Sequence, residues 1–201
     1  MSEKKNRLLV GLFIVLILLI DQISKFYIKL HFPLGGYIEI LPWFQICFVE
    51  NPGMAFGWEF FDKLFLTLFR IIVAGVMCYY LHKLIKRHAK TGYLLTIALV
   101  IAGALGNIID CMFYGLIFSE STPFSIATFM PENGGYAPFL YGKVVDMLYF
   151  PLIHNDMGEV LFFKPVFNIA DSAITIAVFL ILIFYRKELN DSLEKKEKKA
   201  A

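Results

Sequence analysis

The chain has 201 residues, of which 58% are hydrophobic and only 18% charged, with a formal net charge of +2 and a mean hydropathy of +0.66. Soluble domains are about 45–50% apolar and about 25% charged, so this composition indicates an integral membrane protein, and the small net charge gives no electrostatic reason to expect nucleic-acid binding. The three cysteines and four histidines are dispersed. We therefore expect no disulfide framework, no metal site and no cofactor.

Four apolar stretches are long enough to cross the ~30 Å hydrocarbon core of a bilayer. The first follows a basic N-terminus, but no small-x-small cleavage site comes after it, so we expect a retained helix rather than a signal peptide. A single membrane domain, residues 1–201, is predicted. Its spans are 8–28, 63–85, 92–118 and 166–185, its connections are 31–62, 86–91 and 119–165, and its tail is 186–201.

The first long connection is rich in aromatic and β-branched residues over positions 37–50, which favours short strands. Asn51, Pro52 and Gly53 then form a turn signal, and residues 54–58 return to an extended pattern. A hairpin on the membrane surface, anchored by Trp43 and Trp58, explains this segment as well as a functional site does. The predicted fold class is an all-α membrane protein with four transmembrane helices and a small β element.

Basic residues predict the orientation of these spans. The N-terminus, the short loop 86–91 and the tail 186–201 carry most of the lysine and arginine, so the positive-inside rule places all three in the cytoplasm. The connections 31–62 and 119–165 then face the outside.

Polar residues recur toward the outer ends of the spans, in pairs three or four positions apart and therefore on one helix face. In a structural interpretation, such residues form ion pairs that fix helix packing, because pairing lowers the cost of an intramembrane charge. We expect the pairs Asp21–Lys25 and Asp110–Arg70. The polar layer comprises Asp21, Lys25, Arg70, Asn107, Asp110, Asn168 and Asp171.

Two aspartates stand apart from these pairs. Asp146 lies just outside the fourth span in the segment KVVDMLYF, and Asp171 lies one or two turns inside that span. Lys143 is one candidate partner for Asp146, but too few cations remain to neutralise every carboxylate. Two carboxylates without private counter-ions could share a proton and act as acid and base in peptide hydrolysis. The chain has no GxSxG motif for a serine nucleophile.

Five short motifs occur in a fixed order across the four spans. They are DQISK at 21–25, NPGMAF at 51–56, GALGNIID at 103–110, VVD at 144–146 and FNIAD at 167–171. In these motifs the chain resembles lipoprotein signal peptidase, also called signal peptidase II, a family of aspartyl proteases of the bacterial inner membrane.

The resemblance implies that Asp146 and Asp171 are the catalytic dyad. It implies a diacylglyceryl-modified prolipoprotein as substrate, cut on the amino side of the lipidated cysteine. It also implies a β-cradle in the first connection and inhibition by globomycin-type cyclic peptides. The topology places the active site near the outer face, and we expect contact with membrane lipids and a monomeric enzyme. The residues implied to line or support the site are Asn51, Gly53, Asn107, Asp110, Asn168 and Ala170, with Asp21 and Lys25 close by.

The chain departs from the family pattern at Cys111, where an arginine usually follows the GNxxD motif, and in the length of the connection 119–165. We expect Arg70 to replace the missing arginine beside Asp110, and Asn168 or a loop amide to steady the oxyanion. Two other functions stay open. A proton- or ion-coupled transporter would use the intramembrane aspartates, although transporter sites usually lie near the midplane, and a non-catalytic scaffold would need no unpaired carboxylates.

Overall fold

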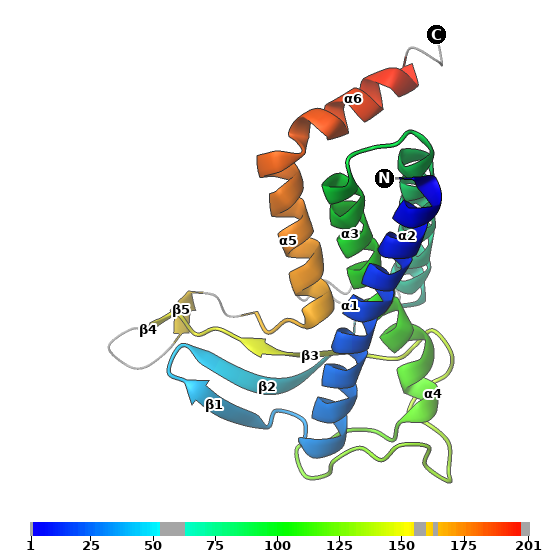
Figure 1. Cartoon of the computed structure of the whole chain (residues 1–201). Helices are drawn as coiled ribbons and strands as arrows, with labels where there is room; N and C mark the ends of the chain where they lie inside the picture. The colour runs from blue at the N-terminus through cyan, green and yellow to red at the C-terminus, as the bar shows by residue number, and fades with distance from the viewer. Residues whose placement is uncertain (1, 53–62, 155–159, 163–164, 198–201) are drawn as a thin grey trace.

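The protein is a bundle of apolar helices that carries a small antiparallel sheet at one end (Figure 1). This computed structural model describes residues 2–52, 63–154, 160–162 and 165–197. The N-terminus and α6 both lie at the end of the bundle away from the sheet. The predicted fold class, mostly helical with a small β element, is confirmed.

The helices follow the predicted spans closely. α1 is Glu3–His31, α2 is Lys63–Lys86, α3 is Thr91–Ile109, and the short π-helix η1 (Asp110–Tyr114) and α4 (Gly115–Ile117) continue α3. α5 is Ile169–Phe184, and the tail forms α6, Arg186–Glu197. Among the described residues three helices are long and apolar enough to cross a membrane, and a fourth span results if α5 and α6, bent by 86°, count together.

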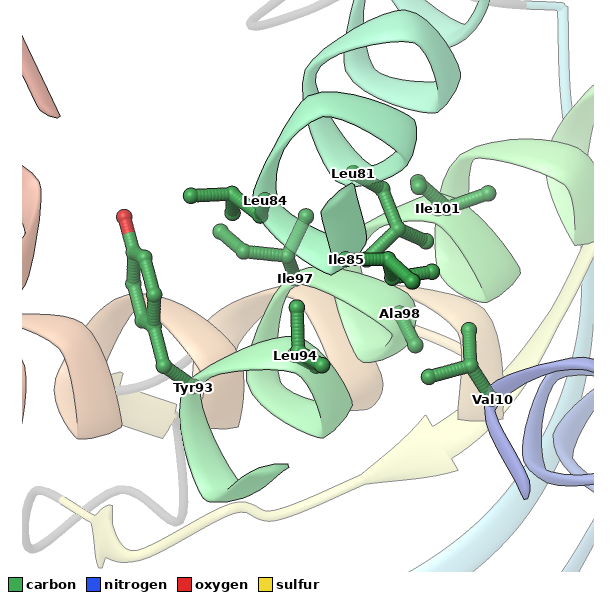
Figure 2. Close-up of a cluster of buried hydrophobic side chains, with 9 residues drawn as sticks. All are labelled: Val10, Leu81, Leu84, Ile85, Tyr93, Leu94, Ile97, Ala98 and Ile101. Carbon is green, nitrogen blue, oxygen red and sulfur yellow. The ribbon is translucent and has the colours of Figure 1, made fainter. Parts of the chain in front are cut away.

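α3 is the central helix of the bundle. In the continuous helix Thr91–Ile117, which α3 begins, 67% of an 18-residue apolar stretch is buried inside the molecule. The corresponding stretches of α1 and α2 are each 17% buried. The outward faces of α1, α2 and α5 are apolar and exposed, as expected of helices that face lipid. At the end of the bundle away from the sheet, α1, α2 and α3 share one core (Figure 2). Its buried members are Val10, Leu81, Leu84, Ile85, Tyr93, Leu94, Ile97, Ala98 and Ile101.

Small residues let α3 approach α5 and α1. A Cβ atom on Gly103 would lie 2.4 Å from the main-chain oxygen of Ala170, and one on Gly106 would lie 2.6 Å from Oδ2 of Asp21. Small residues in this span therefore allow the close helix packing seen here. The close approach brings α1 and the start of α5 to the same point on α3.

The sheet has the order β1-β2-β3, with β1 at Tyr37–Leu41, β2 at Phe44–Asn51 and β3 at Val144–Tyr149. A separate pair joins β4, Ile153–His154, to β5, Val160–Phe162. The strands predicted at 37–50 are confirmed, whereas β3 was not predicted as a strand. The extended pattern at 54–58, with Trp58, lies outside the described residues.

A second core joins the sheet to the helices, and the segment between α4 and β3 packs beside it. The Gly142 N–H donates to the main-chain oxygen of Cys111 at 2.9 Å, and the Ala137 N–H donates to that of Gly115 at 3.0 Å. The segment is thereby attached to the end of the α3–η1–α4 helix. The buried members of the second core are Ile28, Phe32, Phe48, Tyr114, Phe118, Val145 and Met147.

Candidate active site

β3 and the first turn of α5 bring the two predicted catalytic aspartates to the same place. Leu148 and Phe167 exchange main-chain hydrogen bonds of 2.7 and 3.0 Å, which hold the segment before α5 against β3. Asp146 lies two residues before Leu148, and Asp171 lies in the first turn of α5. Asp171 was predicted one or two turns inside the fourth span, but α5 begins only at Ile169, so Asp171 lies within its first turn.

Asn168 connects the two aspartates. It is the N-cap of α5, and its side chain accepts a hydrogen bond of 2.9 Å from the Asp171 N–H while its own N–H lies 3.4 Å from Oδ2 of Asp171. This reciprocal arrangement is a capping box. The Asn168 side-chain NH₂ group donates to Oδ1 of Asp146 at 2.7 Å and to the main-chain oxygen of Val145 at 3.3 Å. One residue thus begins the helix and orients both carboxylates.

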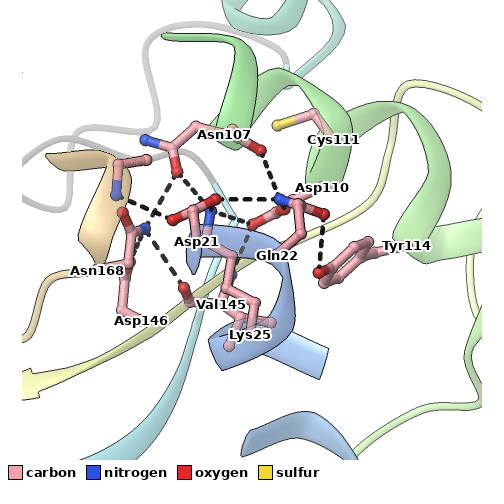
Figure 3. Close-up of polar contacts among 12 residues, drawn as sticks. Asp21, Gln22, Lys25, Asn107, Asp110, Cys111, Tyr114, Val145, Asp146 and Asn168 are labelled. Atoms are coloured by element: carbon pink, nitrogen blue, oxygen red, sulfur yellow. Dashed lines mark hydrogen bonds and ion pairs between the residues drawn. The ribbon is translucent and has the colours of Figure 1, made fainter. Parts of the chain in front are cut away.

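Asn107, on α3, extends this network. Its Nδ2 donates to Oδ1 of Asp171 at 2.8 Å, and its Oδ1 accepts from Asn168 at 3.1 Å and from the Lys25 ammonium at 2.9 Å. The Asn107 amide therefore lies between the Lys25 ammonium and the two aspartates. Figure 3 shows Asn107 beside Lys25 and Asn168.

Lys25 is the buried cation beneath the site. Its ammonium lies 2.9 Å from Oδ2 of Asp21, 2.8 Å from Oδ2 of Asp110 and 2.9 Å from Oδ1 of Asn107. The side chains of Lys25 and Asp110 are fully buried. An ammonium has three donors, so these three acceptors satisfy it. The predicted pair Asp21–Lys25 is confirmed.

The predicted pair Asp110–Arg70 is wrong, because Lys25 is the partner of Asp110. Nη1 of Arg70 instead lies 3.5 Å from Sγ of Cys111. Successive side chains on a helix point about 100° apart, so Cys111 faces α2 while Asp110 faces α1. Asp110 also accepts hydrogen bonds from the Val145 N–H, at 3.3 Å, and from Gln22, at 2.9 Å, and so joins β3 to the helices.

Asp21 holds the first turn of α5. Its Oδ1 accepts a hydrogen bond of 2.9 Å from the N–H of Ala170, one of the unpaired donors at a helix N-terminus. Gln22 bridges Asp21, at 3.0 Å, and Asp110. Gln22 was not predicted as a member of the site, because an uncharged neighbour of Asp21 gives no ion-pairing signal in the sequence.

Asn51, at the end of β2, hydrogen-bonds to Asp146. Gly53 lies outside the described residues, so its predicted role stays a prediction. A buried ion pair between Lys29 and Glu50, the residue before Asn51, was not predicted either. The available signal was the spacing of Lys29, four residues after Lys25 and so on the same face of α1.

The surroundings of Asp146 raise its pKa to about 7. Burial, which penalises the charged carboxylate, is the largest cause, and the negative charge of Asp171 is the next. Hydrogen bonds from Asn168 and Asn51 and the charge of Lys25 lower the pKa and oppose these effects in part. A carboxyl group with this pKa can give and take a proton near neutral pH.

Known proteins resemble this chain over nearly its whole length. Residues 13–186 match the family described as signal peptidase (SPase) II. A lipoprotein signal peptidase of Porphyromonas gingivalis is 46% identical over 94% of this chain and 87% of its own length. One from Amoebophilus asiaticus is 34% identical over 91% of this chain and 80% of its own length.

Solved structures agree with these sequence matches. A bacterial membrane enzyme determined by the in meso method superimposes with a TM-score of 0.62 at 26% identity and covers 90% of each chain. A second such structure gives a TM-score of 0.59 at 27% identity, over 87% of this chain and 90% of the other. The chain belongs to the signal peptidase II family and is a membrane peptidase.

Proposed function

We propose that the protein is an aspartyl endopeptidase that removes the signal peptide from diacylglyceryl-modified prolipoproteins, cutting on the amino side of the lipidated cysteine. The observation that carries the proposal is the pair of carboxylates, Asp146 and Asp171, connected through Asn168 where the apolar bundle meets the sheet. Family membership supports the substrate class, since the relatives are lipoprotein signal peptidases.

The two carboxylates have different surroundings, and this supports different roles. Asp171 lies at the N-terminus of α5 and receives N–H donors from Asn107 and Asn168, which suits a carboxylate anion. Asp146 is 3% exposed, and its raised pKa suits the member that holds the proton. In the resting dyad Asp171 is therefore the base and Asp146 the acid.

The reaction follows from these roles. Asp171 takes a proton from a water molecule while the water oxygen attacks the scissile carbonyl carbon, and Asp146 gives its proton to the carbonyl oxygen. As the C–N bond breaks, Asp171 gives its proton to the leaving nitrogen and Asp146 takes back the proton of the hydroxyl. The dyad is then in its starting state, and no covalent intermediate is needed.

Asn168 acts in this scheme by positioning rather than by binding the oxyanion. Its NH₂ group already donates to Asp146, to Asn107 and to the main-chain oxygen of Val145. The developing negative charge on the carbonyl oxygen is neutralised by the proton from Asp146 instead of by a hydrogen bond from Asn168.

The setting of the site supports a lipid-linked substrate. An apolar groove of about 660 Å³ runs between α1 and the sheet, and its lining includes Met147, next to Asp146, and Ile169, next to Asn168. The acyl chains remain in the bilayer or in this groove while the peptide reaches the dyad. Globomycin-type cyclic peptides and membrane lipids are the other ligands we propose. We also propose that the enzyme acts as a monomer.

We place the enzyme in the bacterial inner membrane, with both termini cytoplasmic and the dyad near the outer face. The distribution of lysine and arginine supports this orientation. So does the position of the sheet at the end opposite the N-terminus and α6 (Figure 1). A polar network at one end of the bundle does not favour a transporter, nor does membership of a peptidase family.

The test is cleavage of a diacylglyceryl-modified prolipoprotein, followed by gel shift, for the wild type, Asp146→Asn and Asp171→Asn. Asp191→Asn, at an exposed position on α6, is the matched control. We expect each dyad change to abolish cleavage in folded, membrane-inserted protein and the control to cleave normally. Normal cleavage by either dyad variant would overturn the proposal.

A further inference from the structure

A second buried charge cluster lies beside the sheet. Glu50 forms an ion pair with Lys29 of α1 and a second one, at 3.2 Å, with Lys143. The Ser121 hydroxyl donates to Oε1 of Glu50 at 3.1 Å and accepts from Lys29 at 2.9 Å. Ser121 and Lys143 come from opposite ends of the segment that connects α4 to β3, so this one carboxylate joins α1, β2 and both ends of that segment.

The cluster is deeply buried. The Lys29 side chain is fully buried and that of Glu50 is 3% exposed. The Lys29 ammonium also lies over aromatic rings, 5.3 Å from the centroid of Phe118 and 5.0 Å from that of Tyr136. Buried ion pairs are a poor source of stability compared with apolar packing. A role in fixing geometry explains the cluster better than a gain in stability does.

The position of Glu50 in β2 connects the cluster to the dyad. Glu50 pairs with Val145 of β3, and Val49 pairs with Asp146. Side chains alternate along a strand, so Glu50 points to one face of the sheet while Val49 and Asn51 point to the other. Asn51 is therefore a diagonal neighbour of Asp146 on the same face, where it makes the hydrogen bond to that carboxyl group.

The residue after Asn51 is held as well. Nζ of Lys63, at the start of α2, donates to the main-chain oxygen of Pro52 at 3.1 Å. Asn51 thus lies between two anchored neighbours, and Glu50 is the one anchored by buried charges.

We propose that Glu50 is a positioning residue for peptide hydrolysis: held by Lys29 and Ser121, it fixes the end of β2 so that Asn51 meets Asp146. The same contacts attach the segment between α4 and β3 to the active site. The inference rests on the proposed role of Asp146 as the catalytic acid.

The sign of a pH effect separates positioning from simple electrostatics. Among the described residues, the charges that act on Asp146 are those of Asp171 on α5 and Lys25 on α1. Asp21 on α1 and Asp110 on η1 pair with Lys25. Glu50, with Lys29 and Lys143 beside it, points to the far face of β2. Removing the negative charge of Glu50 would by itself lower the pKa of Asp146. Loosening the Asn51 hydrogen bond would raise it, because that bond stabilises the charged carboxylate.

The experiment is the pH profile of kcat/KM with a diacylglyceryl-modified prolipoprotein, whose alkaline limb reports loss of the proton from Asp146 in the free enzyme. The variants are Glu50→Gln, Asn51→Ala, their double mutant, and Ser121→Ala, which changes no charge. Glu39→Gln, an exposed position on β1, is the matched control. We expect Glu50→Gln, Ser121→Ala and Asn51→Ala each to move the alkaline limb to higher pH. In the double mutant, the limb should lie at the same pH as in Asn51→Ala alone, because both changes act through the same hydrogen bond.

An alkaline limb that stays in place or moves to lower pH in Glu50→Gln would overturn the positioning role. If that variant does not fold, the limb of Ser121→Ala decides in the same way. The Asp146→Asn variant in the same assay keeps the two proposals apart. Cleavage by Asp146→Asn would contradict the proposed function itself. An inactive Asp146→Asn variant together with an unchanged pH profile of Glu50→Gln would contradict only the positioning role of Glu50.

Discussion

Asn168 donates a side-chain hydrogen bond of 2.7 Å to Oδ1 of Asp146, across the junction between α5 and β3. Asn168 is also the N-cap of the helix that carries Asp171. Because the same residue begins α5 and holds Asp146, the distance between the two carboxylates depends on a helix cap rather than on a flexible loop. This arrangement fixes the two carboxylates relative to each other, as the proposed dyad requires.

Asn168→Ala should therefore lower activity and stability together. Loss of an N-cap costs about 1 kcal/mol, and taking the Asn168 donor away from the buried Oδ1 of Asp146 costs about 1–3 kcal/mol. If that second amount appears in the transition state, kcat falls roughly 10- to 100-fold. The measurement is kcat with the lipid-modified substrate, together with thermal unfolding in detergent. Asn190→Ala, at an exposed position on α6, is the control. A variant with normal kcat would contradict the positioning role of Asn168.

Lys25→Met should destabilise the fold more than any other single change in the network. It leaves Asp21 and Asp110, both buried, without their shared cation, and breaking a buried ion pair costs about 3–5 kcal/mol. We expect a large drop in the midpoint of thermal unfolding and little folded protein in the membrane. Lys5→Met, an exposed position on the same helix, should unfold like the wild type. Equal stability of the two variants would contradict the central place of Lys25.

Arg70→Ala should leave the Asp110 cluster intact, because Lys25 supplies the cation. We expect its unfolding free energy to stay within about 0.5 kcal/mol of wild type. Cys111→Arg should instead destabilise the protein by at least about 1–3 kcal/mol, since Cys111 is 1% exposed and a larger side chain overpacks its site. If Arg70→Ala were unstable and the added change Cys111→Arg restored its stability, the result would support the predicted Asp110–Arg70 pair after all.

The helices, and the two aspartates of the proposed dyad as a candidate site, could be recognised from sequence because their signals are local. An apolar run of sufficient length predicts a span wherever it packs, and an unpaired intramembrane aspartate predicts a site. β3 could not be predicted in this way. Its apolar residues are equally consistent with a strand and with a segment that leads into the fourth span. It becomes a strand because β2, about a hundred residues earlier in the chain, pairs with it.

The partner of Asp110 could not be predicted for a related reason. Spacing along a helix shows which residues share a face, but not which neighbouring helix that face meets. Lys25 was assigned to Asp21 alone because they lie four residues apart, and the close approach of α1 to α3 gives it Asp110 as well. The ion pair of Lys29 with Glu50 was missed for the same reason.

The pKa of Asp146 should fall in Asp171→Asn. The negative charge of Asp171 is the second-largest cause that raises the pKa of Asp146 to about 7, so removing that charge makes ionisation of Asp146 easier. The infrared band of the protonated carboxyl group, followed against pH, measures this without enzyme activity. Asp191→Asn serves as the control. An unchanged titration of Asp146 would show that the two carboxyl groups do not interact.

Gly103→Ala should separate α5 from α3. The new Cβ atom would lie 2.4 Å from the main-chain oxygen of Ala170 and 2.6 Å from Cγ1 of Ile174, and a main-chain oxygen at the start of α5 cannot turn away as a side chain can. We expect a loss of about 1–3 kcal/mol in stability, typical of overpacking. A drop in kcat should accompany it, because Asp171 moves with α5 relative to Asn107.

The matched control is Gly75→Ala, on α2, where nothing lies within 4 Å of the added Cβ atom. That change should keep full activity and gain up to about 1 kcal/mol, because alanine favours the helix over glycine. Thermal unfolding and kcat, measured on both variants in the same detergent, separate the two effects. If both glycines respond alike, the propensity of alanine outweighs the contact at Gly103, and the close packing of α3 on α5 is not what holds Asp171 in place.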